Sequence, residues 1–233
     1  MLRSDNIQCM NRERVKIAQD VATALAHELR NPVVAITSAA QLLRYRISDD
    51  PLIEKNIGRI KREADRLGVV VEALLEYGRP DPVHLTPADP DDVWTHVLAH
   101  HRPNLEAKAI LARHTPAEPR VTCNIDREQL GQAFSRALTN AIEAAPEGSD
   151  LLIGSSTGDD GSWRSAVRND GAPISPDTLS RAFDPLVTTK PGHAGVGLAI
   201  AQRVVTDHAG SISLESGDGA GTTLTFKLPV VHG

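Results

Sequence analysis

The residues best suited to chemistry are a histidine and the five residues after it, His27-Glu28-Leu29-Arg30-Asn31-Pro32. A neutral imidazole is a competent nucleophile near pH 7. On a helix Glu28 is rotated by about 100° from His27, so its carboxylate can hold one ring nitrogen, fix the tautomer and raise the basicity of the other nitrogen. Pro32 cannot donate to the carbonyl of Glu28, so we expect a kink beside the nucleophile. Taken alone, a histidine on a helix is more often a solvated side chain on a charged face, and other residues have to support a catalytic interpretation.

A second set of chemically suggestive residues lies in the C-terminal half, where glycines recur beside polar side chains. Asn140 falls on a predicted helix, and its amide oxygen is a hard ligand suited to Mg²⁺. Asn169 follows a predicted strand, where its side chain can accept a hydrogen bond from the amino group of adenine. Gly171, two residues later, allows the backbone to approach the base closely.

Other motifs of this half are suited to phosphate groups. Gly195-Val196-Gly197 opens a predicted helix at Leu198, and the N–H groups and dipole of a helix N-terminus make an anion site. Residues 183–192 predict a mobile loop that contains Thr189 and Lys190, with the ammonium group of Lys190 available to phosphates. A turn between the last two predicted strands contains Gly219, Gly221 and Thr222. Glycines that only make turns are common, but several such clusters in one order favour a nucleotide site.

Composition and charge narrow the class of protein. Hydrophobic residues make up 40% of the 233 residues and charged residues 24%, which is typical of a globular chain. The net charge of -5 argues against a nucleic-acid partner. Two cysteines, Cys9 and Cys123, suggest no disulfide framework and favour a reducing, cytoplasmic setting. No apolar run is long enough to span a bilayer, so we expect a membrane connection only if an upstream sensor belongs to the same protein.

Residues 14–80, after an N-terminal tail of residues 1–13, predict a helical hairpin. The first helix runs from about residue 14 to 46, and capping residues before Pro51 start the second. The second helix has an apolar seam with alternating steps of four and three, the heptad pattern of a bundle, formed by Ile53, Ile57, Ile60, Ala64, Leu67, Val71 and Leu74. Two helices cannot bury this seam well, so we expect a homodimer with a four-helix bundle. The alternative is a hairpin that packs on the C-terminal half of its own chain.

Residues 83–231 predict a second domain in which strands and helices are mixed. We expect helices at about 91–101, 126–145 and 198–208. Strands are expected at about 83–85, 110–112, 121–125, 151–155, 165–168, 211–215 and 222–228. The tight connections of the last third favour antiparallel pairing, so the fold class is α+β, a helical hairpin followed by an α/β sandwich.

Together these motifs resemble the catalytic core of a bacterial sensor histidine kinase. The string from His27 to Pro32 resembles the phospho-acceptor box of that family, in which the histidine is phosphorylated on a ring nitrogen. By that resemblance Glu28 is the acid/base partner of His27, and Asn31 positions water to dephosphorylate a partner protein. The clusters from Asn140 to Thr222 resemble the N, G1, F, G2 and G3 boxes of the Bergerat (GHKL) ATP-binding fold, which implies ATP and Mg²⁺, with Asn140 at the metal.

The resemblance implies autophosphorylation of His27 by ATP and transfer of the phosphoryl group to an aspartate of a response regulator receiver domain. It also implies phosphatase activity towards that regulator. Val34, an apolar residue on the face of His27, would then be a docking spot for the receiver or an ordinary packing residue.

Three positions depart from the family pattern and motivate a different function. Asn169 stands where the family usually has Asp, Pro173 where it has a second glycine, and Arg136 where it often has a second Asn. Arg136 would pair with phosphates if it points into the pocket, and one metal contact is lost if it points out. The alternative is therefore a nucleotide-poor signalling scaffold, a pseudokinase that acts through its dimeric docking face. An ATPase of the chaperone or topoisomerase kind is weaker, because it leaves the box at His27 unexplained.

Overall fold

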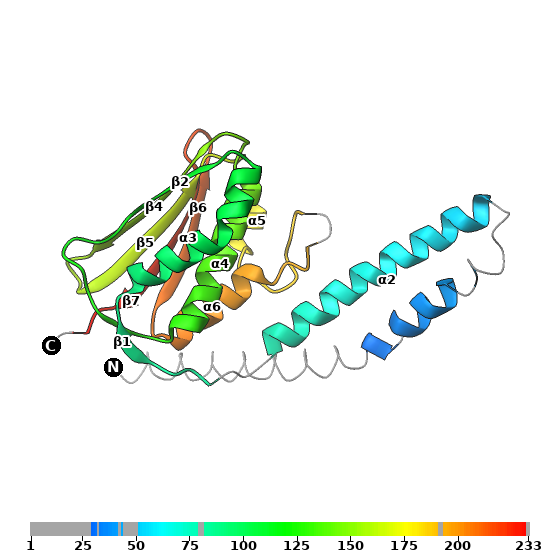
Figure 1. Cartoon of the computed structure of the whole chain (residues 1–233), viewed down its shortest axis with the longest axis horizontal. Helices are drawn as coiled ribbons and strands as arrows, with labels where there is room; N and C mark the ends of the chain where they lie inside the picture. The colour runs from blue at the N-terminus through cyan, green and yellow to red at the C-terminus, as the bar shows by residue number, and fades with distance from the viewer. Residues whose placement is uncertain are drawn as a thin grey trace. The chain divides into compact units, whose positions relative to one another are not determined.

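The structure is a computed structural model that describes residues 29–31, 33–41, 43, 51–78, 82–190 and 193–231 (Figure 1). The chain forms two compact units. The first contains Met1–Asp81 with Thr188–Val196, and the second contains Pro82–Val187 with Gly197–Gly233. Each unit is described by itself below.

The first unit is helical over its described residues. Residues 29–31, 33–41 and 43 are helical, and α2 spans Pro51–Gly78, so the predicted start of the second helix is confirmed. The predicted ends of the first helix, at about residues 14 and 46, lie outside the described residues.

The apolar seam of α2 divides into two rows. Ile57, Ala64 and Val71, each seven residues apart, are buried within the single chain. Ile60 and Leu67, also seven residues apart, are 42% and 46% exposed. The hairpin therefore covers one row of the seam and leaves the other open.

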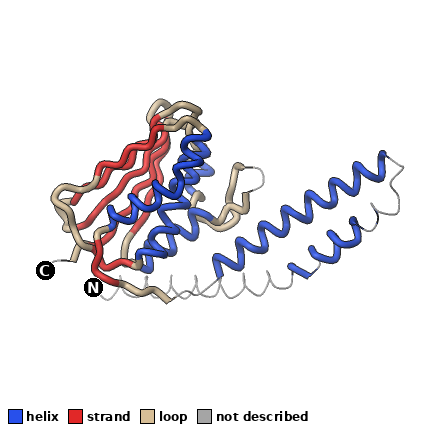
Figure 2. The backbone as a smooth tube through the Cα atoms, in the orientation of Figure 1, coloured by secondary structure: helices blue, strands red, loops and turns tan. Residues whose placement is uncertain are grey.

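The second unit is an α+β sandwich, as predicted, in which helices cover one face of a five-stranded sheet (Figures 1 and 2). Its strands are β2 (Leu111–Thr115), β4 (Asp150–Thr157), β5 (Ser162–Asn169), β6 (Ser211–Gly217) and β7 (Gly221–Pro229). They are arranged in the order β2-β4-β5-β7-β6. Only β2 and β4 pair in parallel, and the other neighbours are antiparallel, as the short connections predicted. A separate antiparallel pair joins β1 (Thr86–Ala88) to β3 (Cys123–Ile125).

The helices of this unit are α3 (Pro90–Ala107), α4 (Arg127–Ala144), α5 (Pro176–Ser180) and α6 (Gly197–Asp207). An aromatic cluster packs α3 and α4 onto the sheet. Trp94 stacks on Phe134 with ring centroids 4.1 Å apart, and Phe134 meets Phe226 of β7 at 4.8 Å and Trp163 of β5 at 6.0 Å. These four side chains are fully buried, so each contributes a large apolar area to the core.

Three expectations about elements were wrong. Residues 83–85 are not a strand; the backbone N–H of His84 donates to a carboxylate oxygen of Asp126 at 3.0 Å, and the ladder begins at Thr86. Helix α3 continues past residue 101 and includes Pro103 in its interior. The short helix α5 was not predicted; it begins at Pro176 after its cap Ser175, whose hydroxyl accepts from Thr178 N.

Candidate functional site

Helix α4 positions the predicted metal ligand. Asp126 caps its N-terminus, because one carboxylate oxygen accepts from the backbone N–H groups of Glu128 and Gln129 at 3.1 Å each. Asn140 lies one turn from the other end, half-buried. Its amide nitrogen lies 3.9 Å from the place where a Cβ on Gly197 would be. The structure therefore brings the amide group of Asn140 to the N-terminus of α6, where Gly197 and Leu198 were predicted to bind anions.

The turn after β5 packs against the C-terminal end of the same helix. A Cβ added at Gly171 would lie 2.5 Å from the carbonyl oxygen of Ala144, so only glycine fits there without a shift of backbone. The ladder between β5 and β7 pairs Asn169 with Thr222. Gly221 has a φ of 70°, and a Cβ there would collide with the carbonyl oxygen of Asn169. Asn169, Gly171 and Thr222 thus lie together at the turn after β5, and this turn rests against the end of α4 that contains Asn140.

Asn169 has a role in its own turn that the sequence analysis missed. It is 4% exposed, and its side-chain oxygen accepts a hydrogen bond from the backbone N–H of Gly171 at 3.0 Å. This is an Asx turn, in which a side chain replaces a backbone acceptor. The oxygen that we expected to bind adenine already holds the turn.

Lys108 is a further residue that the sequence did not reveal. Its ammonium group donates to the carbonyl oxygens of Ile142 at 2.8 Å, Glu143 at 3.1 Å and Ala145 at 3.0 Å. A cation bound to the last carbonyls of a helix is favoured by the helix dipole as well as by the hydrogen bonds. Lys108 therefore fixes the end of α4 on which the turn at Gly171 rests.

Four predicted phosphate-binding residues fall in the first compact unit. They are Thr189, Lys190, Gly195 and Val196. Locally, the backbone N–H of Lys190 donates to the hydroxyl of Thr188 at 3.0 Å. Gly195 has a φ of 68°, a left-handed conformation that favours glycine.

Arg136 of α4, which departs from the family pattern, lines a groove of about 710 Å³ between α3 and α4. The groove also contains His96 and His100 of α3 and Thr139 of α4. Asn140 is directed to α6 instead. The two positions that the family pattern places together on α4 therefore reach different neighbours in this chain.

The predicted phospho-acceptor His27 and its partner Glu28 lie outside the described residues. Asn31 is described and is exposed on a helix, as are Ser38 and Val34, which is 59% exposed. Within one chain, Val34 is therefore not a packing residue, and it remains available to a partner.

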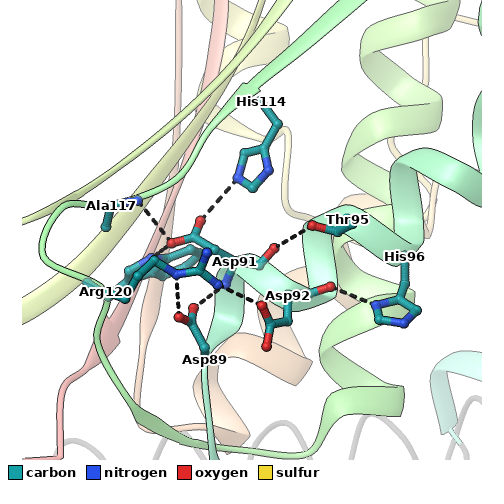
Figure 3. A network of polar contacts seen from close by, with 9 residues as sticks. Asp89, Asp91, Asp92, Thr95, His96, His114, Ala117 and Arg120 are labelled. Atoms are coloured by element: carbon teal, nitrogen blue, oxygen red, sulfur yellow. Dashed lines mark hydrogen bonds and ion pairs between the residues drawn. The ribbon is translucent and has the colours of Figure 1, made fainter.

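A buried carboxylate elsewhere in the second unit is structural rather than catalytic (Figure 3). Asp91, in the first turn of α3, is 1% exposed and accepts hydrogen bonds from His114 Nε2, Ala117 N and Trp163 Nε1, each at 3.1 Å. Burial raises its pKa, but these hydrogen bonds outweigh burial and lower the pKa from 3.8 to about 2. Every contact comes from the protein itself, so Asp91 joins α3 to the sheet and offers nothing to a substrate.

Within the described part of the chain, no three histidine, cysteine or acidic residues are grouped so that they could hold a metal ion. The metal prediction rests on the amide of Asn140 and is a different kind of site. Likewise, none of the helices in the described ranges is long and apolar enough to cross a membrane.

Two known families match the two halves of the chain. Residues 18–82 match the His Kinase A (phospho-acceptor) domain. Residues 125–232 match the family described as histidine kinase-, DNA gyrase B- and HSP90-like ATPase. The second match includes Asn140, Asn169, Gly171 and Thr222.

Similar proteins match over most of the length of this chain. Sensor histidine kinase ZraS of Klebsiella oxytoca is 30% identical over 219 residues, which cover 94% of this chain and 47% of that relative. Signal transduction histidine-protein kinase AtoS of Escherichia coli is 29% identical over 229 residues, 94% of this chain and 36% of the relative. The chain thus spans between about a third and a half of the length of these relatives.

Solved structures agree on the fold. Histidine kinase ThkA, solved in complex with the response regulator protein TrrA, matches with a TM-score of 0.67 and 25% identity over 94% of this chain and 64% of that one. Full-length ShkA in complex with AMPPNP matches with a TM-score of 0.64 and 23% identity, over 93% of this chain and 47% of that one. A phospho-acceptor domain followed by an ATPase domain of this type is the catalytic core of a histidine kinase, and the chain belongs to that family.

Proposed function

We propose that this chain phosphorylates itself on His27 with ATP and passes the phosphoryl group to an aspartate on the receiver domain of a response regulator. One observation supports this above the others: a phospho-acceptor domain that contains the His27 box is joined, in one chain, to an ATPase-type domain in which Asn140, Asn169, Gly171 and Thr222 converge. The nucleophile and the nucleotide site then belong to one protein. This reaction belongs in the cytoplasm, where ATP and response regulators are found.

In the proposed reaction a ring nitrogen of His27 attacks the terminal phosphorus in line. The N–P bond forms while the bond from that phosphorus to the bridging oxygen breaks, and ADP leaves. Glu28 holds the other ring nitrogen, so that the attacking nitrogen keeps its lone pair and the ring carries its new positive charge beside a carboxylate. Catalysis in such a step is mostly positioning and charge neutralisation.

The residues of the second unit fit a nucleotide with its magnesium ion. Mg²⁺ takes few protein ligands and shares the phosphates, so one amide oxygen from Asn140 suits it. When bound, the ion neutralises charge on the phosphates. The first N–H groups of α6, at Gly197 and Leu198, offer donors to the same phosphates. Thr189, Lys190, Gly195 and Val196 would complete the phosphate contacts when the nucleotide is bound.

The active form is a homodimer through the helical hairpin. Ile60 and Leu67 on α2 are exposed at heptad spacing, and the other helix exposes a matching set, Leu29, Ile36 and Leu43, also seven residues apart. Apolar rows at this spacing on both helices suit a four-helix bundle made by two hairpins.

The receiver domain docks on the exposed face that contains Asn31, Val34 and Ser38. On this face an apolar contact at Val34 can bind the partner while Asn31 orients the water that dephosphorylates it. The proteins ThkA and TrrA, crystallised together, are a kinase and a regulator, which supports this kind of partner. Arg136 faces the α3–α4 groove, so we assign it no phosphate contact.

The test is incubation of the full chain with γ-labelled ATP and Mg²⁺. We expect label that is acid-labile and base-stable, and that is absent from His27→Gln. A folded dimer that never becomes labelled would instead be the nucleotide-poor scaffold, for which the similar proteins offer no support. Phosphate release that is unchanged in His27→Gln would indicate a simple ATPase.

A second variant separates the two activities of the His27 face. Asn31→Ala should leave the rate of autophosphorylation within about twofold and slow dephosphorylation of the receiver by about tenfold or more, the usual contribution of a positioned group. Equal losses of both activities would show that Asn31 has no separate role in positioning water.

A further inference from the structure

The side chain of Asn169 has a fixed orientation. The backbone N–H of Gly171 points at it from 3.0 Å and needs an acceptor. An amide has its acceptor on one side and its two donors on the other, and the reverse orientation would put two donors face to face. The oxygen therefore faces Gly171, and the NH₂ group faces away from the turn.

That NH₂ group makes no hydrogen bond with any residue in the described ranges, although Asn169 is only 4% exposed. The nitrogen is not one of the fully buried side-chain atoms that lack a partner in the described part of the chain, so it keeps access to solvent. No hydrogen bond joins it to Thr222, its neighbour in the ladder, whose hydroxyl is hydrogen-bonded to the hydroxyl of Ser216 at 2.8 Å. The donor is available to whatever occupies the site.

The neighbouring carboxylate of Asp170 does not accept a hydrogen bond from the NH₂ group of Asn169. Its carboxylate pairs with Arg168 at 3.2 Å, and its side chain is 60% exposed. Successive residues at the end of a strand point to opposite sides, so a charge at position 170 is on the surface while position 169 is buried. The turn thus presents an amide donor where a carboxylate would present only acceptors.

We propose that Asn169 donates a hydrogen bond to position 6 of the purine, so that the site accepts 6-oxopurine nucleotides, GTP and ITP, alongside ATP. This inference rests on the proposed function and names the bases that its nucleotide site admits. The 6-oxo group of guanine and hypoxanthine is an acceptor and matches the NH₂ group. The 6-amino group of adenine is a donor and must use the second lone pair of the Asn169 oxygen or a water molecule.

The phosphoryl step is the same for each nucleotide. The bond from His27 to the terminal phosphorus forms, the bond to the bridging oxygen breaks, and the nucleoside diphosphate leaves. Base selection therefore acts on binding, and a measurement of affinity tests it directly.

The experiment compares ATP with ITP, which differ at position 6 and in the proton on N1, by calorimetric titration of the full chain. For the wild-type chain we expect the two dissociation constants to agree within about threefold, because each base finds one matched group. In Asn169→Asp the carboxylate still accepts from Gly171 but repels the 6-oxo group, so the ratio should shift towards ATP by about tenfold or more. Asp170→Asn is the matched control, and its ratio should stay at the wild-type value.

The outcomes separate this inference from the function on which it rests. If the wild-type chain becomes labelled on His27 by ATP, but prefers ATP over ITP by tenfold or more and keeps that preference in Asn169→Asp, the base inference is wrong and the kinase remains. If neither nucleotide binds, both proposals are wrong. If Asp170→Asn changes the ratio as much as Asn169→Asp does, the selection lies in the charge of the turn and not in the donor of Asn169.

Discussion

Replacing Asp91 by Asn should destabilise the second unit far more than the same change at Asp92. Both residues lie in the first turn of α3, so both variants lose the same favourable interaction with the helix dipole. Asp91 is 1% exposed and accepts three hydrogen bonds, whereas the side chain of Asp92 is 48% exposed and pairs with Arg120 at 2.6 Å. A comparison of the two variants therefore separates the effect of burial on stability from the effect of losing a charge.

The size of the effect follows from the contacts. One oxygen of Asp91 accepts from both Ala117 N and Trp163 Nε1, and the other accepts from His114. An Asn has one acceptor atom, which can keep the hydrogen bonds from Ala117 N and Trp163 Nε1, so its NH₂ group would face His114 Nε2, and that ring nitrogen would have to become an acceptor by a change of tautomer. Loss of the buried charge and of the hydrogen bond from His114 together cost about 3 kcal/mol. The exposed ion pair between Asp92 and Arg120 contributes at most about 1 kcal/mol to the free energy of unfolding.

Acid should reduce the difference between the wild-type chain and Asp91→Asn. The folded-state pKa of Asp91 is lowered from 3.8 to about 2, so its contribution is complete above the unfolded pKa and is lost as the pH falls through the folded pKa. That drop corresponds to about 2.5 kcal/mol at about 1.4 kcal/mol per pKa unit. The stability gap should therefore be constant from pH 7 to 5 and narrow between pH 4 and 2.

Tryptophan fluorescence during urea unfolding of the full chain measures this directly. The chain has two tryptophans, Trp94 and Trp163, and both lie in the second unit. The signal thus follows this unit even when the helical hairpin is present. A loss of less than about 1 kcal/mol in Asp91→Asn, equal to that in Asp92→Asn, would refute the view that the hydrogen-bonded carboxylate holds α3 on the sheet.

Three other changes test the site and the dimer. Gly221→Ala should raise the calorimetric dissociation constant for ATP at least tenfold, because the new Cβ would collide with the carbonyl oxygen of Asn169. Gly219→Ala is the matched control: Gly219 has a similar φ of 71°, but no atom lies within 4 Å of the place of its Cβ, so the affinity should change little. Lys108→Met should cost about 2 kcal/mol in urea unfolding and weaken ATP binding about fivefold, and Lys108→Arg should restore most of both, because the three carbonyls at the end of α4 need a cationic donor. Ile60→Glu should give a monomer in analytical ultracentrifugation and Lys61→Glu a dimer; a dimer from both would place the interface elsewhere.

The parts of the site that the sequence predicted are those with local signals. The helix predicted at about residues 126–145 follows from short-range rules of helix chemistry, and the structure confirms it from Arg127 to Ala144, after the cap at Asp126. The glycine at position 171 makes room for the carbonyl group of Ala144, whereas its approach to a base stays a prediction. The Asx turn at Asn169 was also local, but its consequence was missed. The oxygen of Asn169 was predicted to bind a nucleotide, but the turn itself requires that oxygen as the acceptor for Gly171 N.

The parts that could not be predicted depend on contacts between distant residues. Lys108 reaches carbonyl groups that are 34 to 37 residues away in sequence, and Asp91 binds Trp163 across 72 residues. Neither pairing has a signature in spacing or composition. The helix predicted at about residues 91–101 continues to Ala107, because passing Pro103 requires the loss of only one backbone hydrogen bond.

Helices α4 and α6 form the frame of the nucleotide site, because contacts at both ends set their register. At one end the backbone N–H of Asp126, the cap of α4, donates to Nε2 of His208 at 2.9 Å, and Nδ1 of the same ring donates to Val204 O at 2.7 Å. At the other end Asn140 meets the first residue of α6 at Gly197. Two antiparallel helices tied in this way cannot slide by a turn without breaking a buried hydrogen bond. The position of the amide of Asn140 relative to the first N–H groups of α6 is therefore set by His208, a residue at the far end of this pair of helices.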